Sequence, residues 1–410
     1  MINNTLIDTD EEKAKAFGSK LFRTFNNQIE DTQTFNEHHQ QFIDNFINNE
    51  LYFDSYIDKQ VVPITLEELN EALNKTKNKT SEDLYGISNF IIKRLPDNFK
   101  LLILNFFNLC LIKNYLPSDW KSSIITMIPK KGDTHDIKSY RPISTTACLM
   151  KTLEKIISSR LKHHLKLNNV IIKQQSGFRD NRQTKDNIYF MSQKILEAFG
   201  KKKKVCCILF DIQSAFDKVW HNGLIYKLYK INTPFYMLEW LKNFLQNRQF
   251  RVKVGEYMTE SYNITCGVPQ GAVLSPTLFS IFINDIPISS KKNENYSLLF
   301  ADDLAKIIIF DKINENVNIK INKELSSLQS WLTNWRLKMA PEKCSYTIFS
   351  LSYKSGDKGT KGVIKEELNL SMYNKSISKN NEPLFLGMRF DKYMCFKNQV
   401  KYLKKVVMID

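Results

Sequence analysis

The pattern of apolar and polar residues predicts a chain of many helices with a small antiparallel sheet in its middle. Two helix starts are marked by capping boxes, Thr9 to Glu12 and Thr65 to Glu68. Apolar positions at helical spacing predict helices at 9–25, 65–75, 89–95, 99–115, 147–167, 186–198, 224–229, 235–245, 275–284 and 317–337. Alternating or continuous apolar runs predict strands at 123–128, 205–210, 250–254, 262–266, 346–350 and 384–389, and a hairpin at 297–310.

Three aspartates stand where these apolar strands end. Asp211 follows the strand at 205–210, and Asp302 and Asp303 occupy the turn of the hairpin. An aspartate in a turn is most simply a turn-forming residue. Three carboxylates on adjacent strand ends, however, would repel one another unless cations bind there. Carboxylate oxygens suit Mg²⁺, and a pair of such ions serves phosphoryl transfer in polymerases and nucleases.

The charge of the chain points in the same direction. The 410 residues include 59 Lys and Arg against 43 Asp and Glu, a net charge of +16. Such a surplus favours a polyanionic partner, of which nucleic acid is the simplest example. The alternative is an ordinary basic surface, and the charge alone does not decide between the two. An odd number of cysteines without a C-x-x-C pair argues against a disulfide framework and fits a reducing, intracellular compartment. No apolar run reaches the roughly 18 residues of a membrane span, so we expect no membrane partner. No targeting signal distinguishes nucleus from cytoplasm.

The aspartates belong to a series of recognisable motifs. The box at 300–303, Phe-Ala-Asp-Asp, resembles the tyrosine/phenylalanine-alanine-Asp-Asp box of reverse transcriptases. The segment at 211–221, reading DIQSAFDKVWH, resembles the first catalytic-aspartate motif of non-LTR (LINE-type) retrotransposon polymerases. Further segments resemble the Pro-Gln-Gly motif, two fingers blocks and two later palm motifs of that family: 267–276, 128–144, 175–184, 331–343 and 385–387. Seven motifs in family order, between about 75 and 391, form a very specific pattern.

The resemblance implies an α+β fold, the fingers and palm of a right-hand polymerase. The palm would be an antiparallel sheet backed by helices, and the thumb would be largely absent. The implied domains begin with N-terminal accessory or linker helices at 1–60 and an N-terminal fingers extension at 61–109. A reverse transcriptase domain follows at 110–391, with fingers at about 110–200 and palm at about 201–391. Residues 392–410 would be a truncated start of the thumb or connection.

The resemblance also implies roles for single residues. Two Mg²⁺ or Mn²⁺ ions would be bound by Asp211 and Asp302, with Asp303 as a weaker third carboxylate and the Ile212 carbonyl completing one shell. Lys343 would protonate the leaving pyrophosphate as a general acid. The implied nucleotide-binding residues are Lys130, Lys131, Arg141, Phe216 and Gln270. The implied template- and primer-binding residues are Arg179, Gly271, Phe385, Leu386 and Gly387.

Each of these side chains also has a simpler explanation. Phe216 would lie under the sugar and exclude a 2′-hydroxyl, yet taken alone it is better explained as a core aromatic. The lysines and arginines, taken singly, are most simply solvated surface charges. Gly271 would let the backbone approach nucleic acid closely. The alternative is a simple turn, which the neighbouring motif disfavours.

The implied function is RNA-directed DNA polymerase. It would add deoxynucleotides to a primer 3′-hydroxyl by two-metal phosphoryl transfer during non-LTR retrotransposition. Its partners would be an RNA template, a DNA primer and deoxynucleoside triphosphates, and the oligomeric state stays open. One competing hypothesis is a catalytically incompetent, nucleic-acid-binding remnant, which the expected lack of a thumb supports. A two-metal nuclease is a weaker third hypothesis, disfavoured by the motifs around Phe216 and Gln270.

Overall fold

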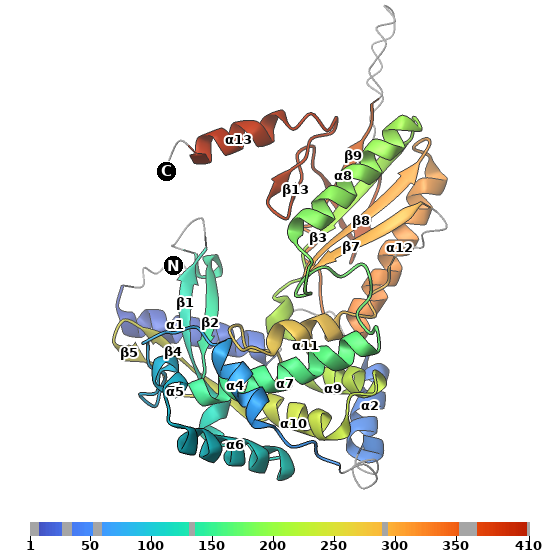
Figure 1. Cartoon of the computed structure of the whole chain (residues 1–410). Coiled ribbons are helices and arrows are strands. Elements are labelled where there is room, and N and C mark those ends of the chain that lie inside the picture. Colours follow the sequence, from blue (N-terminus) through green and yellow to red (C-terminus); the bar gives the residue numbers. More distant parts are fainter. Residues whose placement is uncertain are drawn as a thin grey trace, which may run out of the picture. The chain divides into compact units, whose positions relative to one another are not determined.

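The chain folds into two compact units, each assembled from two stretches of sequence (Figure 1). Unit 1 consists of Met1–Ile171 and Ser214–Phe282, and unit 2 of Ile172–Gln213 and Ile283–Asp410. The structure is a computed structural model, and it describes residues 8–26, 35–51, 60–130, 136–288, 294–351 and 367–407. The expected domain boundaries stay predictions. No helix in these ranges is long and apolar enough to cross a membrane.

Unit 1 contains a five-stranded sheet in the order β2-β1-β4-β5, with β6 also paired to β4. Its strands are β1 (Ser122–Pro129), β2 (Tyr140–Thr145), β4 (Arg248–Val254), β5 (Tyr257–Met258) and β6 (Tyr262–Ile264). The β1–β4 pair is parallel and the others are antiparallel. Helix α1 (Asp10–Phe25) packs on this sheet through Phe17, Leu21 and Phe25. The capping box expected at its start is formed by Thr9 and Glu12.

Helices make up most of the rest of unit 1. They are α2 (Glu37–Asn45), the π-helical η1 (Phe46–Glu50), α4 (Leu66–Asn74), α5 (Asn89–Lys93), α6 (Asp97–Ile112), η2 (Ser118–Lys121), η3 (Ile137–Ser139), α7 (Cys148–Leu167), η4 (Ala215–Lys218), α9 (His221–Lys230), α10 (Phe235–Leu245) and α11 (Ser275–Phe282). Long, periodic helices such as α7 and α10 were predicted closely, because their buried stripes are continuous. The polar sequence of α2 and η1 gave no such signal, and the pattern missed both.

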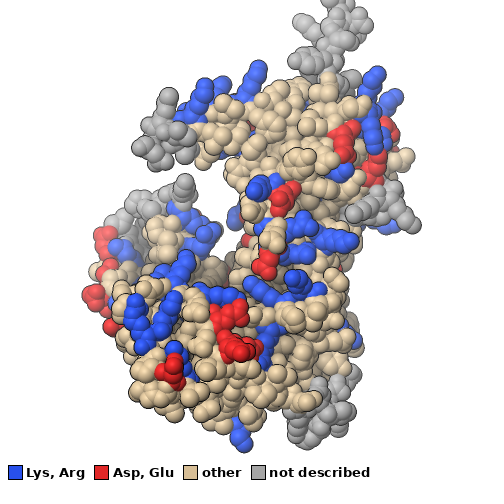
Figure 2. Space-filling view, viewed as in Figure 1, with Lys and Arg blue, Asp and Glu red and all other residues tan. Residues whose placement is uncertain are grey.

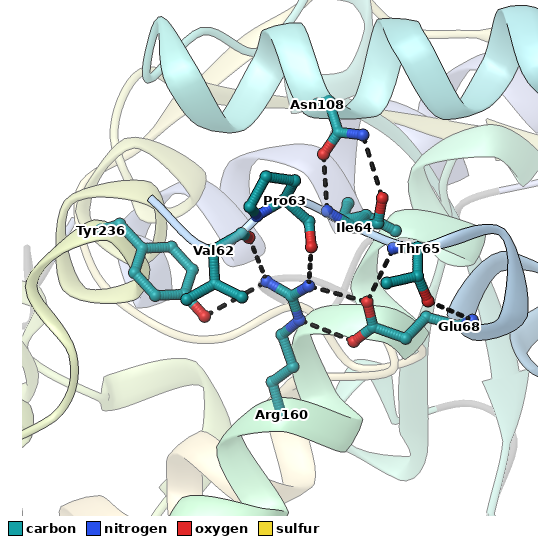
Figure 3. A network of polar contacts seen from close by, with 8 residues as sticks. All are labelled: Val62, Pro63, Ile64, Thr65, Glu68, Asn108, Arg160 and Tyr236. Atoms are coloured by element: carbon teal, nitrogen blue, oxygen red, sulfur yellow. Dashed lines mark hydrogen bonds and ion pairs between the residues drawn. The ribbon is translucent and has the colours of Figure 1, made fainter. Parts of the chain in front are cut away.

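Arg160 of α7 fixes the chain that leads into α4 (Figure 3). Its guanidinium donates to both carboxylate oxygens of Glu68, each at 2.7 Å, and to two backbone carbonyls just before α4. The Nη1 that donates to the Val62 carbonyl also donates to the hydroxyl of Tyr236 at 3.2 Å. Glu68 also accepts the Thr65 N–H at 3.0 Å and so completes the capping box of α4. One carboxylate therefore joins a local helix cap to a long-range ion pair.

Unit 2 is built on a five-stranded sheet in the order β12-β9-β3-β8-β7. Its strands are β3 (Lys204–Phe210), β7 (Asn295–Phe300), β8 (Asp303–Phe310), β9 (Ser345–Phe349) and β12 (Ser378–Lys379). All neighbours are antiparallel except β12 and β9. Helix α8 (Thr184–Gly200) packs against one face of the sheet (Figure 1), where Met191, Ile195 and Phe199 enter the core.

Short hairpins and two further helices complete the described part of unit 2. They are α12 (Glu315–Asn334), β10 (Ser371–Met372), β11 (Lys375–Ser376), β13 (Leu384–Phe385), β14 (Met388–Arg389) and α13 (Lys397–Val407). The single strand expected at 384–389 is wrong. The chain reverses there because Leu386 and Gly387 adopt positive φ angles of 49° and 84°, which pairs β13 with β14 as a hairpin.

Candidate active site

A two-residue turn and the first residue of β8 carry the paired aspartates of unit 2. Strands β7 and β8 pair up to Phe300 and Asp303, so Ala301 and Asp302 form the turn between them. Ala301 has φ of 56°, in the left-handed region that residues with a Cβ seldom occupy. A turn of this kind persists only where its surroundings hold it.

Gln175 holds this turn from the loop before α8. Its side chain is 1% exposed, and its Oε1 accepts the N–H of Ala301 at 3.1 Å and that of Gly177 at 2.7 Å. Its Nε2 lies 3.4 Å from the Ala301 carbonyl. A Cβ on Gly177 would lie 2.2 Å from the Ala301 nitrogen, so only glycine fits beside the turn. Sequence reasoning assigned no role to Gln175, although it is the first residue of the fingers block at 175–184.

Asp211 reaches the same edge of the sheet from β3. Strand β3 pairs with β8 in a register that ends with Phe210 opposite Leu304, so the next residue lies beside the turn. The Asp211 carbonyl accepts the N–H of Ala340 at 3.0 Å, and Ile212 forms a bridge with Met339. These contacts fix the backbone on which Asp211 stands. The expected convergence of strand-end aspartates is therefore present within unit 2.

The electrostatics of this edge favour a cation. Burial, together with the negative charges of Asp302 and Asp211, raises the pKa of Asp303 to about 6. A bound cation would remove this repulsion. Lys343 supplies one positive charge, with its Nζ 3.8 Å from Asp211 Oδ2, but the two side chains are 61% and 46% exposed. An ion pair so open to solvent stabilises the fold very little.

The donor set fits a divalent metal in its chemistry but is not preassembled. In the described ranges, no group of three or more His, Cys, Asp or Glu side chains is arranged to hold a metal ion. Carboxylates are nevertheless the ligands that Mg²⁺ takes in proteins, commonly together with substrate phosphates. A metal at Asp211, Asp302 and Asp303 would therefore need movement of these side chains or ligands from a bound triphosphate.

The Pro-Gln-Gly loop lies in unit 1, and Gln270 forms hydrogen bonds to β2 and to Asp217. The Gln270 carbonyl accepts the Ser144 N–H at 2.7 Å, and its side-chain Nε2 donates to Asp217 Oδ1 at 2.8 Å. Gly271 has φ of 120°, and a Cβ there would lie 2.6 Å from the Ser144 carbonyl oxygen. The glycine is thus explained by contact with β2, and its expected approach to nucleic acid stays a prediction.

Asp217 is a residue of this region that sequence reasoning missed. It is only 7% exposed, and burial raises the pKa of its carboxyl to about 6. The hydrogen bond from Gln270 and the charges of Lys130, Lys218 and Lys20 act against this rise. The signal was visible as the second aspartate of DIQSAFDKVWH.

The neighbouring Phe216 packs within unit 1. Its ring stacks on Phe279 with centroids 4.4 Å apart and planes 19° apart. This contact agrees with the simpler explanation of Phe216 as a packing aromatic. It does not test whether the ring also lies beneath a sugar, so that role stays a prediction.

The basic residues expected to bind the triphosphate lie on or next to β1 and β2. Lys130 follows β1, and its backbone N–H donates to the Ser139 carbonyl at 2.7 Å. Arg141 is exposed on β2 opposite Ile128. Lys131 lies outside the described residues.

The residues expected to bind template and primer in unit 2 are engaged with the protein. Arg179 donates through Nη1 to two carbonyls of the loop 172–175, at 3.1 and 3.3 Å, and so supports the loop that holds the aspartate turn. Phe385 is buried in the core of unit 2, where it anchors the hairpin whose turn is Leu386 and Gly387. Their contacts with nucleic acid stay predictions.

Comparison with known proteins identifies the family. A family model described as reverse transcriptase (RNA-dependent DNA polymerase) matches residues 128–390. Among solved structures, apo telomerase from Candida tropicalis, truncated from its C-terminal domain, matches with a TM-score of 0.43 and 15% identity. That match covers 67% of this chain and 54% of the telomerase chain.

Curated relatives agree with the family model. The RNA-directed DNA polymerase from mobile element jockey of Drosophila melanogaster is 32% identical over 330 residues, covering 79% of this chain and 34% of that protein. The probable RNA-directed DNA polymerase from transposon BS of the same species is 31% identical over 331 residues, covering 78% and 35%. This chain thus spans about a third of the length of these relatives. The expected α+β polymerase fold and the resemblance to non-LTR retrotransposon enzymes are confirmed, and the chain belongs to the reverse transcriptase family.

Proposed function

We propose that this chain carries the polymerase centre of a non-LTR retrotransposon and adds deoxynucleotides to a DNA primer along an RNA template. The observation that carries the proposal is the placement of Asp211, Asp302 and Asp303 at one edge of the unit 2 sheet, in a chain of the reverse transcriptase family. The net charge of +16 agrees with nucleic-acid substrates, and on the face drawn in Figure 2 Lys and Arg cover more surface than Asp and Glu.

Reverse transcriptases use divalent metal ions. In this chain, Asp211 and Asp302 would hold two Mg²⁺ or Mn²⁺ ions, with Asp303 as a weaker ligand and the Ile212 carbonyl completing one shell. Such a pair of ions, when bound, lowers the pKa of the attacking hydroxyl and neutralises charge on the leaving pyrophosphate. The raised pKa of Asp303 supports a cation at this edge, because a bound cation would offset the repulsion from Asp302 and Asp211 that contributes to it. Lys343, beside Asp211, donates a proton to the pyrophosphate.

Residues of unit 1 orient the incoming nucleotide in this proposal. Lys130, Lys131 and Arg141 bind its triphosphate, and Phe216 excludes a 2′-hydroxyl. Asp217 orients Gln270, because an ionised carboxylate only accepts hydrogen bonds and therefore holds the NH₂ side of the amide. The amide oxygen of Gln270 is then presented to the nucleotide or the template pair.

The remaining predicted residues contact the nucleic acids. Arg179 and Gly271 contact the template, and the hairpin turn at 385–387 grips the primer end. In this proposal, residues 110–391 form the reverse transcriptase domain, which includes the fingers and the palm. A nuclear or cytoplasmic location suits such a function.

The test is RNA-templated primer extension with Mg²⁺ by the wild-type chain, Asp302→Asn and Asp311→Asn. Both variants exchange one carboxylate for an amide at opposite ends of β8, but only Asp302 lies at the proposed metal site. We expect Asp302→Asn to lower the extension rate about a thousandfold, equal to about 4 kcal/mol of transition-state stabilisation, and Asp311→Asn to keep it. RNA binding without extension by the wild-type chain would instead support the remnant, and primer shortening would support the nuclease.

A further inference from the structure

Two lysines bind the two oxygens of Thr76 in unit 1, and a third lysine lies beside one of them. Lys93, at the end of α5, donates from Nζ to the Thr76 carbonyl at 2.9 Å, and Lys155 of α7 donates to the Thr76 hydroxyl. Lys151 lies one turn before Lys155 on the same helix, so the two side chains share a face. Thr76 is only 4% exposed, and its two oxygens therefore hold two ammonium groups close together at fixed positions.

The cluster carries positive charge that the protein does not neutralise. Burial lowers the pKa of Lys155, and the charges of Lys151 and Lys93 lower it further. The charge of Glu154 acts in the opposite direction but less strongly, and this buried carboxylate accepts the N–H groups that precede α11. Within the described ranges, none of the three lysines forms an ion pair. Like charges held together in this way are stabilised when an anion binds between them.

We propose that Lys93, Lys151 and Lys155 bind phosphates of a single-stranded nucleic-acid backbone, which in the proposed function is the RNA template. Each ammonium has three N–H donors, so the two lysines bonded to Thr76 keep two donors each for phosphate oxygens. None of the three lysines lies in a recognised motif. The group recognised is a phosphate, which a free nucleotide also carries.

The test is equilibrium binding of fluorescein-labelled U15 RNA between 50 and 200 mM salt, without metal ions or nucleotides. The double variant Lys151→Gln/Lys155→Gln is compared with Lys162→Gln/Lys166→Gln, which removes the same charge from exposed positions further along α7. We expect the first to bind U15 about tenfold more weakly. Its slope of log affinity against log salt should fall by about 1.4, since each phosphate contact with a single strand contributes about 0.7.

Further arms separate this site from general surface charge. The affinity for A15 should fall by the same factor as that for U15, because phosphates carry no base identity. Lys151→Arg/Lys155→Arg keeps both charges and should bind U15 as the wild-type chain does. Lys93→Gln tests the site without changing α7, and thermal melting reports whether each variant folds. A separate titration with dATP tests the free nucleotide as ligand. Equal losses of U15 affinity in the two double variants, or a loss of dATP binding with U15 binding unchanged, would overturn the assignment. Because nothing is incorporated in this assay, a chain that binds U15 as expected but extends no primer would refute the proposed function and keep this site.

Discussion

Replacing Asp217 with Asn should make the protein more stable at neutral pH and less active. Burial raises the pKa of this carboxyl from 3.8 to about 6. At 1.36 kcal/mol per unit, keeping Asp217 ionised in the fold costs about 3 kcal/mol at pH 7.5. Asparagine has nearly the same shape, avoids this cost and still accepts the hydrogen bond of Gln270 through Oδ1. It also donates, so it no longer fixes which side of the Gln270 amide faces it.

The sign of the pH effect follows from the raised pKa. The folded state binds the Asp217 proton more tightly than the unfolded state, so the wild-type chain gains stability from this group as pH falls through about 6 toward 3.8. The advantage of the variant should therefore shrink to about 1.5 kcal/mol at pH 5. His221 acts in the opposite direction, because burial lowers its pKa to about 4 and both proteins lose stability as pH falls from 6.5. Comparing variant with wild type at each pH cancels that contribution.

Thermal unfolding at pH 7.5 and pH 5, together with single-nucleotide incorporation, measures both effects. The melting temperature of Asp217→Asn should exceed that of wild type by roughly 5 °C at pH 7.5. Its kcat/KM for the nucleotide should fall about tenfold, mainly through KM. Asp44→Asn is the matched control, since Asp44 also accepts an amide hydrogen bond, from Asn222 at 2.7 Å. A variant that melts below wild type at pH 7.5, or incorporates nucleotides as Asp44→Asn does, would refute this reasoning.

Two other substitutions test the supports of the fold and the site. Gln175→Met keeps the side-chain volume but removes the hydrogen bonds around Ala301. It should lower kcat at unchanged RNA affinity, measured by single-turnover incorporation. It should also destabilise the fold by about 2–3 kcal/mol, measured by urea unfolding. Wild-type kcat in this variant would show that the turn needs no such support. Arg160→Met should destabilise the fold by about 2–4 kcal/mol because it leaves Glu68 partly buried and unpaired. Adding Glu68→Gln should recover part of that loss, and a double variant with fully additive losses would contradict the pairing.

Features that depend on neighbouring residues were predictable from sequence. The capping boxes at Thr9 and Thr65 gave both helix starts, because a cap needs only residues three positions apart. The helix expected at 235–245 has the bounds of α10, because its apolar stripe is uninterrupted. The three aspartates were found because a carboxylate at the end of a buried strand is conspicuous.

Features that depend on distant partners were missed. Gln175 acts on Ala301, 126 residues away, and Asp217 holds Gln270, 53 residues away. A glutamine or a second aspartate in a motif does not reveal such partners, because each contact exists only once the sheet and loops have assembled. The hairpin at 384–389 was missed because its turn places Leu386, a residue with no turn preference, at a positive φ angle.

The most direct test of the central claim supplies one deoxynucleotide at a time to a DNA primer annealed to RNA. The wild-type chain should add only the nucleotide complementary to the next template base, and only when Mg²⁺ or Mn²⁺ is present. This outcome requires both the proposed metal ligands Asp211, Asp302 and Asp303 and the proposed nucleotide-orienting residues. Addition that ignores the template base, addition in the presence of excess chelator, or an unchanged primer would contradict the account.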